Sequence, residues 1–97
     1  HGCITVVGNI APKESAQLHE AWQNKDLDTF FNLRDRLAPL SRDLFCESNP
    51  APVKYAASVL GLCSDEVRAP LVTASDQARA KVDAALKYAE LTKAKAA

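Results

Sequence analysis

The segment that most constrains the fold is residues 2–8, because it reads as a single strand in an otherwise helical sequence. Its residues, Gly-Cys-Ile-Thr-Val-Val-Gly, are mostly apolar or β-branched and show little polar alternation. That pattern predicts a strand buried on both faces, as in a parallel sheet. No later segment resembles a second strand, and a strand without neighbours leaves its backbone N–H and C=O groups unpaired. We therefore expect the neighbouring strands to belong to polypeptide outside these 97 residues.

The remainder of the sequence predicts four helices, from the spacing of apolar residues and from capping residues. They are expected over 12–24, from Asp26 as N-cap to about 46, from an Asn49 N-cap to before Gly61, and from a Ser75 cap to about 91, with a frayed tail beyond. Inward-facing positions are predicted for Leu18, Ala21 and Trp22 in the first helix and for Val82, Ala85, Leu86 and Ala89 in the last. The second helix should bury a stripe of Leu27, Phe30, Phe31, Leu37, Leu40, Leu44 and Phe45.

Charge and cysteine usage exclude several classes of partner and cofactor. Twelve basic and twelve acidic side chains give no net charge, which argues against a nucleic acid or an anionic membrane as partner. Cys3, Cys46 and Cys63 form no CxxC pair and no ligand cluster with His1 and His19. We predict a reduced, cytoplasmic protein with free and mostly buried thiols, without a metal or another cofactor.

The residue types that could carry catalysis occur in contexts that favour structural roles. His19 lies in the middle of a predicted helix, where a histidine is more often a surface or packing residue than a base. Lys54 is expected to be solvated or salt-bridged, because a Schiff-base lysine needs desolvation. Trp22, Phe30 and Tyr55 are predicted to lie in the core, since basic clusters do not surround them. The pattern by itself predicts one buried strand and a helical remainder, with no self-sufficient active site.

Several short strings occur in an order that is similar to one family of (β/α)8-barrel enzymes. They are His1–Ala11, which looks like an eighth barrel strand with its exit loop, then Leu37-Ala-Pro-Leu40, Phe45–Ala56, Leu60-Gly-Leu62 and Arg68-Ala-Pro-Leu71. The most specific is Asn49-Pro-Ala-Pro-Val-Lys54, which resembles the Asn-Pro-x-Pro-Val-Lys string of the dihydrodipicolinate synthases. The resemblance covers residues 1 to about 91 and departs from the family at Thr5-Val-Val-Gly-Asn9, where many members have Ser-Val-x-Ala-Asn.

The resemblance implies an α/β fold, a TIM barrel, of which this mostly α-helical chain is the last part. Residues 1–24 would be the last β/α unit and residues 25–97 a C-terminal helical extension. The intact enzyme would be a cytoplasmic homo-oligomer, a tetramer or a dimer, acting in diaminopimelate and lysine biosynthesis. It would condense pyruvate with L-aspartate 4-semialdehyde through a lysine Schiff base.

The same resemblance assigns little of that chemistry to the present residues. The family's catalytic lysine and tyrosine have no counterpart here, so we expect a structural role and no activity from this chain alone. One position carries over: Ile4 matches the residue of the eighth strand that borders bound pyruvate. Ordinary barrel packing is the alternative role for Ile4, and the two roles are compatible.

Two other functions stay open from the sequence. A free-standing helical module could dock its apolar faces on another protein, with residues 1–9 as an arm that pairs with the partner. A related pyruvate lyase, acting on sialic acid or a keto-deoxy sugar, would keep the enzyme class and change the substrate. The segment from Asn49 to Lys54 argues against this second alternative.

Overall fold

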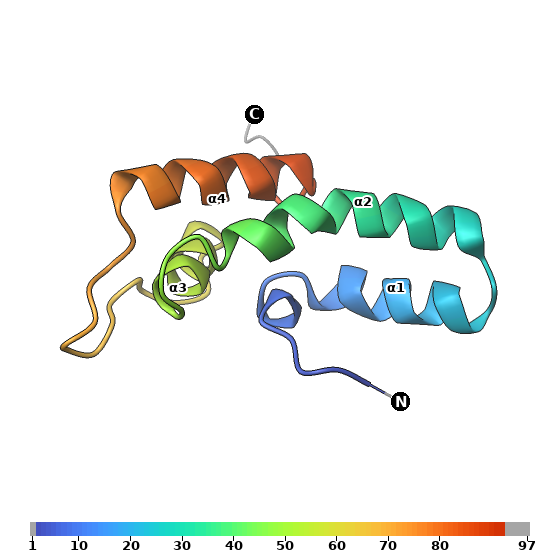
Figure 1. Ribbon diagram of the computed structural model, residues 1–97, viewed down its shortest axis with the longest axis horizontal. Coiled ribbons are helices and arrows are strands. Elements are labelled where there is room, and N and C mark those ends of the chain that lie inside the picture. Colours follow the sequence, from blue (N-terminus) through green and yellow to red (C-terminus); the bar gives the residue numbers. More distant parts are fainter. Residues whose placement is uncertain (1, 93–97) are drawn as a thin grey trace.

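A computed structural model describes residues 2–92 as a helical chain (Figure 1). Its elements are a short 3-10 helix, η1 (Val7–Asn9), followed by α1 (Pro12–Gln23), α2 (Leu27–Asp43), α3 (Ala51–Val59) and α4 (Asp76–Tyr88). The described residues contain no strand, so the prediction of a mostly helical chain is confirmed. The tail expected to fray falls largely on residues 93–97, which lie outside the described part.

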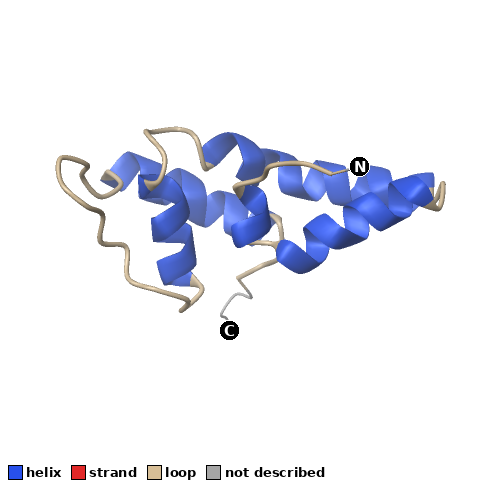
Figure 2. Cartoon of the chain, turned by 90° about the horizontal axis from the view of Figure 1, so that it is seen from below, coloured by secondary structure: helices blue, strands red, loops and turns tan. Residues whose placement is uncertain are grey.

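The long helix α2 organises the molecule, because its two halves pack on different partners. Its first half forms an antiparallel hairpin with α1, and its second half packs against α4 (Figure 1). Helix α3 packs against α4 and also contacts η1. The result is elongated, with extents of 44 × 34 × 20 Å, and the hairpin forms one end of it (Figure 2).

The strand predicted over residues 2–8 is not formed. Residues 2–5 have no regular secondary structure, and Val7–Asn9 is a 3-10 helix closed by the Asn9 N–H donating to the Val6 carbonyl at 3.0 Å. A strand needs a neighbour to complete its ladder, and none of residues 2–92 supplies one. Local turn hydrogen bonds therefore satisfy the backbone of residues 6–11 instead.

Capping chemistry sets most helix ends where the sequence predicts them. The Asp26 carboxylate accepts from the Thr29 N–H at 3.3 Å, and the Ser75 hydroxyl accepts from the Ala78 N–H at 3.2 Å. Gly61 follows the C-cap of α3 with φ +79°, a conformation that glycine adopts without steric cost. These three predictions are confirmed.

Three predicted helix ends are wrong by a few residues, and one of them is that of α4, which ends at Tyr88 rather than near residue 91. Helix α2 ends at Asp43 rather than near Cys46, because the Phe45 and Cys46 N–H groups donate to carbonyls three residues back, in turns. Helix α3 has Pro50, not Asn49, at its N-cap, and no side chain caps it. With Pro52 at its second position, α3 has one N–H fewer to satisfy there.

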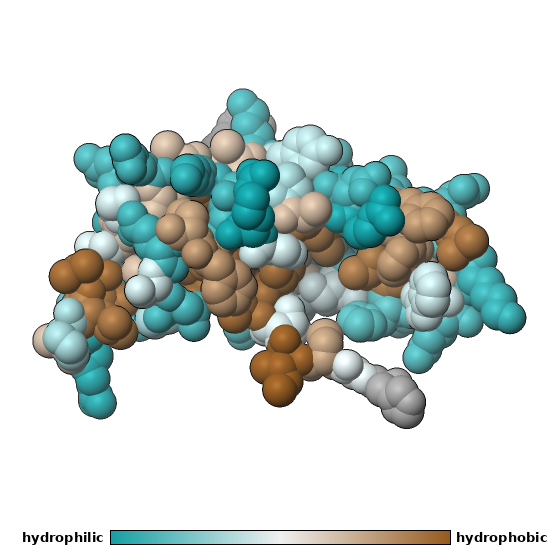
Figure 3. Space-filling view, viewed as in Figure 1, coloured by the Kyte–Doolittle hydropathy of each residue, from teal (hydrophilic) through white to brown (hydrophobic). Residues whose placement is uncertain are grey.

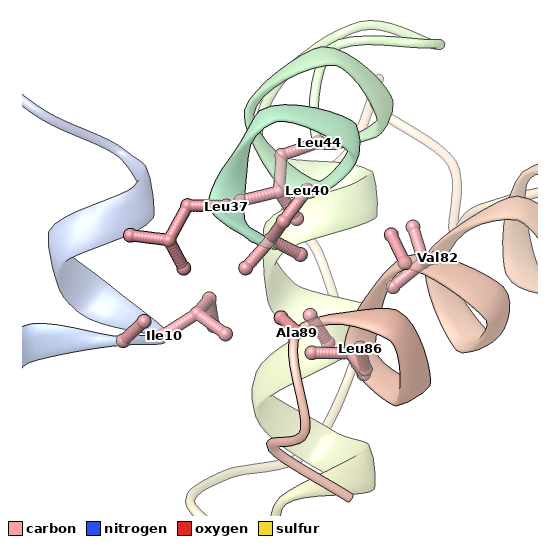
Figure 4. Packing of buried hydrophobic residues seen from close by; sticks show 10 residues of the cluster. Ile10, Leu37, Leu40, Leu44, Val82, Leu86 and Ala89 are labelled. Atoms are coloured by element: carbon pink, nitrogen blue, oxygen red, sulfur yellow. The ribbon is translucent and has the colours of Figure 1, made fainter. Parts of the chain in front are cut away.

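The core lies where α2 crosses α4. Figure 4 shows Leu37 and Leu40 of α2 and its C-cap Leu44 in one cluster with Val82, Leu86 and Ala89 at α4, and with Ile10 beside Leu37. Leu40, Leu44, Val82 and Leu86 are fully buried. The predicted inward face of the last helix, including Ala85, is confirmed.

The predicted core stripe is wrong at its two ends. Leu27 and Phe31 of α2 are 47% and 43% exposed, and Phe45, just after α2, is 56% exposed. Trp22 of α1, also predicted to face inward, is 60% exposed. These side chains keep helical spacing, but the helices present in this chain cover only the middle of the stripe. Figure 3 shows apolar surface over the α1–α2 hairpin, at one end of the molecule.

Candidate functional site

The one position that carries a predicted substrate contact, Ile4, lies on the N-terminal segment, residues 2–6. This segment runs beside the α1–α2 hairpin and borders a groove of about 720 Å³, which we call the N-terminal groove. The groove is lined by Cys3, Thr5 and Val7, by Ser15, Leu18 and His19 of α1, and by Arg34, Leu37, Ala38, Ser41 and Arg42 of α2.

Alternate residues of the N-terminal segment face the helices. Cys3 and Thr5 line the N-terminal groove, whereas Ile4 between them does not and is fully exposed. Side chains of an extended chain point alternately to opposite sides. Ile4 therefore lies on the side of the segment that faces away from α1 and α2.

A close approach between Thr5 and Gly8 fixes the turn that ends the N-terminal segment. The Gly8 N–H donates to the Thr5 hydroxyl oxygen at 3.0 Å. A Cβ added at Gly8 would lie 2.6 Å from Thr5 Cγ2, closer than two carbon atoms can pack. Val6 and Val7 then pack against the core, which anchors the segment to the helices.

Gly8→Ala is expected to destabilise the chain by about 1 kcal/mol, because the added methyl overpacks against Thr5. Thr5→Ser keeps the hydroxyl and removes Cγ2, so the double variant Thr5→Ser/Gly8→Ala should recover most of that loss. Urea unfolding of the wild type, both single variants and the double variant measures this. Equal stability of Gly8→Ala and wild type would contradict the close approach.

The prediction of mostly buried thiols is wrong. Cys3 and Cys63 are exposed, Cys46 is partly buried, and all three are free. His19 is exposed, as predicted, and its Nε2 lies 3.6 Å from the Cys3 sulfur across the N-terminal groove. The sequence places these residues sixteen positions apart, so only the folding of the segment onto α1 brings them together.

A polar cluster that the sequence analysis missed joins α3 to α4. The Tyr55 hydroxyl donates to the Asp83 carboxylate at 2.9 Å, and the Arg79 guanidinium lies 5.0 Å from the centre of the Tyr55 ring. Arg79 also pairs with Asp65 at 3.0 Å. Burial, followed by the hydrogen bond to Asp83, raises the pKa of Tyr55. Tyr55 therefore stays protonated at neutral pH and acts as a hydrogen-bond donor in a structural contact.

The Asn49–Lys54 string lies in the chain between two polar contacts to α4 or its cap, Glu47–Ser75 and Tyr55–Asp83. Lys54 is half-buried on α3. Just before the string, Glu47 accepts hydrogen bonds from the backbone N–H of Ser75, at 3.1 Å, and from the Ser75 hydroxyl. These bonds lower the pKa of Glu47. The string thus belongs to a connection that fixes the start of α4.

Neither a metal-binding cluster nor a membrane-spanning helix is found among the described residues. Among residues 2–92, no three His, Cys, Asp or Glu side chains lie close enough together to bind a metal ion. Helices in that range are also too short or too polar to cross a bilayer. The N-terminal groove pairs one thiol with one imidazole and is also lined by Arg34 and Arg42.

The comparison with protein families decides the assignment. The model of the dihydrodipicolinate synthetase family matches residues 1–89 of this chain. The chain belongs to this family. Membership confirms the resemblance seen in the sequence, and the match includes both the N-terminal segment and the Asn49–Lys54 string.

Individual family members support the same assignment. The 4-hydroxy-tetrahydrodipicolinate synthase of Bradyrhizobium diazoefficiens is 45% identical over 91 residues, and that of Methylobacterium radiotolerans is 50% identical over 91 residues. Among solved structures, a monomeric dihydrodipicolinate synthase variant superposes with a TM-score of 0.87 at 37% identity, over 93% of this chain. The Thermotoga maritima dihydrodipicolinate synthase superposes with a TM-score of 0.86 at 37% identity and the same coverage.

The chain spans only about a third of its relatives. It covers 31% of the Bradyrhizobium diazoefficiens protein and 30% of each of the two solved chains. The helices therefore have the arrangement found in the family, although the N-terminal segment forms no strand.

Proposed function

We propose that this chain is the C-terminal portion of a 4-hydroxy-tetrahydrodipicolinate synthase. The intact enzyme would condense pyruvate with L-aspartate 4-semialdehyde, on the path to diaminopimelate and lysine. The family match over residues 1–89, together with the share of about 31% of a relative's length, is the observation that carries the proposal. A free-standing interaction module would not require the family's sequence over nearly the whole chain.

In this proposal the chain completes the barrel and packs helices against it. Residues 1–24 would complete the (β/α)8 barrel, with residues 2–8 as a strand once their neighbours are present, and residues 25–97 would form a helical extension. The exposed Trp22, Leu27 and Phe31 support this role, because an apolar surface of that kind is normally covered.

Ile4 would wall the pyruvate pocket. Its exposure on the side of the N-terminal segment away from α1 and α2 supports this role, since the barrel interior lies on the opposite side of a strand from its helices. The Schiff-base lysine and the tyrosine that relays protons would belong to other barrel strands. The chain itself would hold no catalytic residue, and the intact enzyme would be a cytoplasmic homo-oligomer, a tetramer or a dimer.

A chimera tests the proposal directly. The 91 matching residues of the Bradyrhizobium diazoefficiens synthase are replaced by those of this chain, and synthase activity is measured with pyruvate and L-aspartate 4-semialdehyde. We expect an active chimera, and no activity from the relative truncated before the replaced segment. A folded chimera that cleaves N-acetylneuraminate would overturn the proposal. So would a folded chimera that does not condense pyruvate with L-aspartate 4-semialdehyde.

Ile4→Asp distinguishes a role of Ile4 in the pyruvate pocket from a role in the stability of the chain. In the 97-residue chain it should leave stability unchanged, because Ile4 is fully exposed there. In the chimera it should raise KM for pyruvate more than about tenfold, because a carboxylate would face the pyruvate carboxylate at short range. An unchanged KM would remove Ile4 from the pocket.

A further inference from the structure

Residues 61–74, which we call the α3–α4 connection, form no helix or strand. They extend away from the helices at one end of the molecule (Figure 1 and Figure 2). Asp65 and Val67 are partly buried and Ala74 is buried, whereas the other residues of the connection are exposed. A connection of this length without regular structure is uncommon in a compact domain and is usually functional or disordered. The contacts that hold it therefore decide how it behaves.

Hydrogen bonds fix both ends of the α3–α4 connection. At its start, the Leu62 N–H donates to the Ala57 carbonyl of α3 at 2.9 Å. Just after its end, the Ser75 N–H donates to the Glu47 carboxylate at 3.1 Å. Neither bond involves residues 63–73, so both can persist when that stretch moves.

One side chain of α4, Arg79, contacts the connection at two points. Its Nη2 donates to the Asp65 carboxylate at 3.0 Å, and its Nε donates to the Ala74 carbonyl at 3.0 Å. The guanidinium also lies 5.0 Å from the centre of the Tyr55 ring on α3. A guanidinium can make these contacts together, because its donors lie along the edge of a plane whose face can pack on a ring. Arg79 thus joins the connection to both α3 and α4.

The Arg79–Asp65 pair is the only tie between residues 63–73 and a helix, among the hydrogen bonds and ion pairs within residues 2–92. The other bonds of this stretch are internal, such as that from the Glu66 N–H to the Ser64 hydroxyl at 3.0 Å. We propose that Arg79 is a latch, which holds the α3–α4 connection closed on α4. Its release lets residues 63–73 open while the helices stay packed.

The latch is separate from the contacts that pack α3 and α2 on α4. Those contacts are the Tyr55–Asp83 hydrogen bond at 2.9 Å and the buried side chains of Val82 and Leu86, and none of these residues belongs to the connection. The partners of the latch all lie on α3, on α4 or in the connection. The latch is therefore complete without residues 2–8 and does not depend on the proposed function. Its opening is a local event rather than unfolding of the chain.

Trypsin measures how often the connection opens. Arg68 is the one lysine or arginine in the connection, so cleavage after it reports on this stretch. The rate of cleavage follows the open population when opening and closing are fast relative to cleavage. In the 97-residue chain, Arg79→Met should speed cleavage after Arg68, followed by mass spectrometry, about five- to twentyfold. Asp65→Asn should give a smaller rise, and the double variant should do no more than Arg79→Met, because the two residues share one contact.

Arg34→Met is the matched control. Arg34 also pairs with an aspartate, Asp35, at 3.0 Å and lies 4.8 Å from the centre of the Phe31 ring, but all three residues belong to α2. It should leave cleavage after Arg68 unchanged. Val82→Ala truncates a fully buried core residue and lowers global stability. Where the chain stays folded, Val82→Ala should change that cleavage less than about twofold.

Equal cleavage of Arg79→Met and the wild type after Arg68 would overturn the latch. An equal rise in Val82→Ala would overturn it too, because cleavage would then follow unfolding of the whole chain. The chimera extends the test to a chain that includes the rest of the relative. Arg79→Met should again speed cleavage after Arg68 there, and an unchanged rate would show that other polypeptide holds the connection and would overturn the latch for the longer protein.

Discussion

Leu40→Ala is expected to lower the free energy of unfolding by about 2–5 kcal/mol, the range for a fully buried leucine. Leu40 is fully buried where α2 meets α4, and its neighbours in the core are the equally buried Leu44, Val82 and Leu86 (Figure 4). Truncation removes three carbons from this contact and leaves a cavity that helices held by other residues cannot close. Urea unfolding followed by circular dichroism measures the change.

Leu62→Ala is the matched control for that experiment. Leu62 is 65% exposed in the connection after α3, so the same three carbons are lost from a site that is already largely hydrated. Its effect should stay within about 0.5 kcal/mol. If the two variants lost similar stability, the core would not lie where α2 crosses α4.

Ser75→Ala should cost about 1–2 kcal/mol, because the hydroxyl makes two bonds at once. It caps α4 by accepting from the Ala78 N–H, and it donates to the Glu47 carboxylate that precedes α3. Its removal frays the first turn of α4 and loosens the connection that carries the Asn49–Lys54 string. Ser48→Ala, at an exposed position beside Glu47, is the control and should be close to neutral.

The Glu47 bonds also predict a dependence of stability on pH. The pKa of Glu47 lies below its ordinary value of 4.5 because Ser75 donates two hydrogen bonds to its carboxylate. Because the pKa of Glu47 is lower in the folded than in the unfolded chain, its ionised carboxylate stabilises the fold. This stabilisation is complete above the unfolded pKa and is lost as the pH falls through the folded pKa. Glu47→Gln should therefore reduce the loss of stability between neutral pH and the acid range, measured as urea midpoints at several pH values. Glu66→Gln, at an exposed site, should leave that loss unchanged.

Much of the helical structure could be predicted from the sequence, because it depends on local chemistry. The caps at Asp26 and Ser75 and the left-handed residue at Gly61 each act within a few residues of their own position. The inward face of α4 follows from spacing alone. The family also followed from strings within the sequence, above all the one from Asn49 to Lys54.

The strand prediction failed where a neighbour was needed. Residues 2–8 have the composition of a buried strand, but a ladder of β-sheet hydrogen bonds forms only between two strands that lie side by side. The family assignment does not depend on this prediction, since the match and the superposed helices stand without the strand. The exposure of Trp22, Phe31 and Phe45 has the same reason. The spacing of apolar residues indicates which face of a helix is apolar, but it does not indicate whether another element packs on that face.

The sequence by itself determined the helices, their caps and the family, because each follows from side chains a few residues apart or from strings read in order. Only the tertiary structure decided that Cys3 meets His19, that Tyr55 meets Asp83, and that Glu47 meets Ser75. Those pairs lie sixteen to twenty-eight residues apart, and the helices between them must pack before the pairs can form.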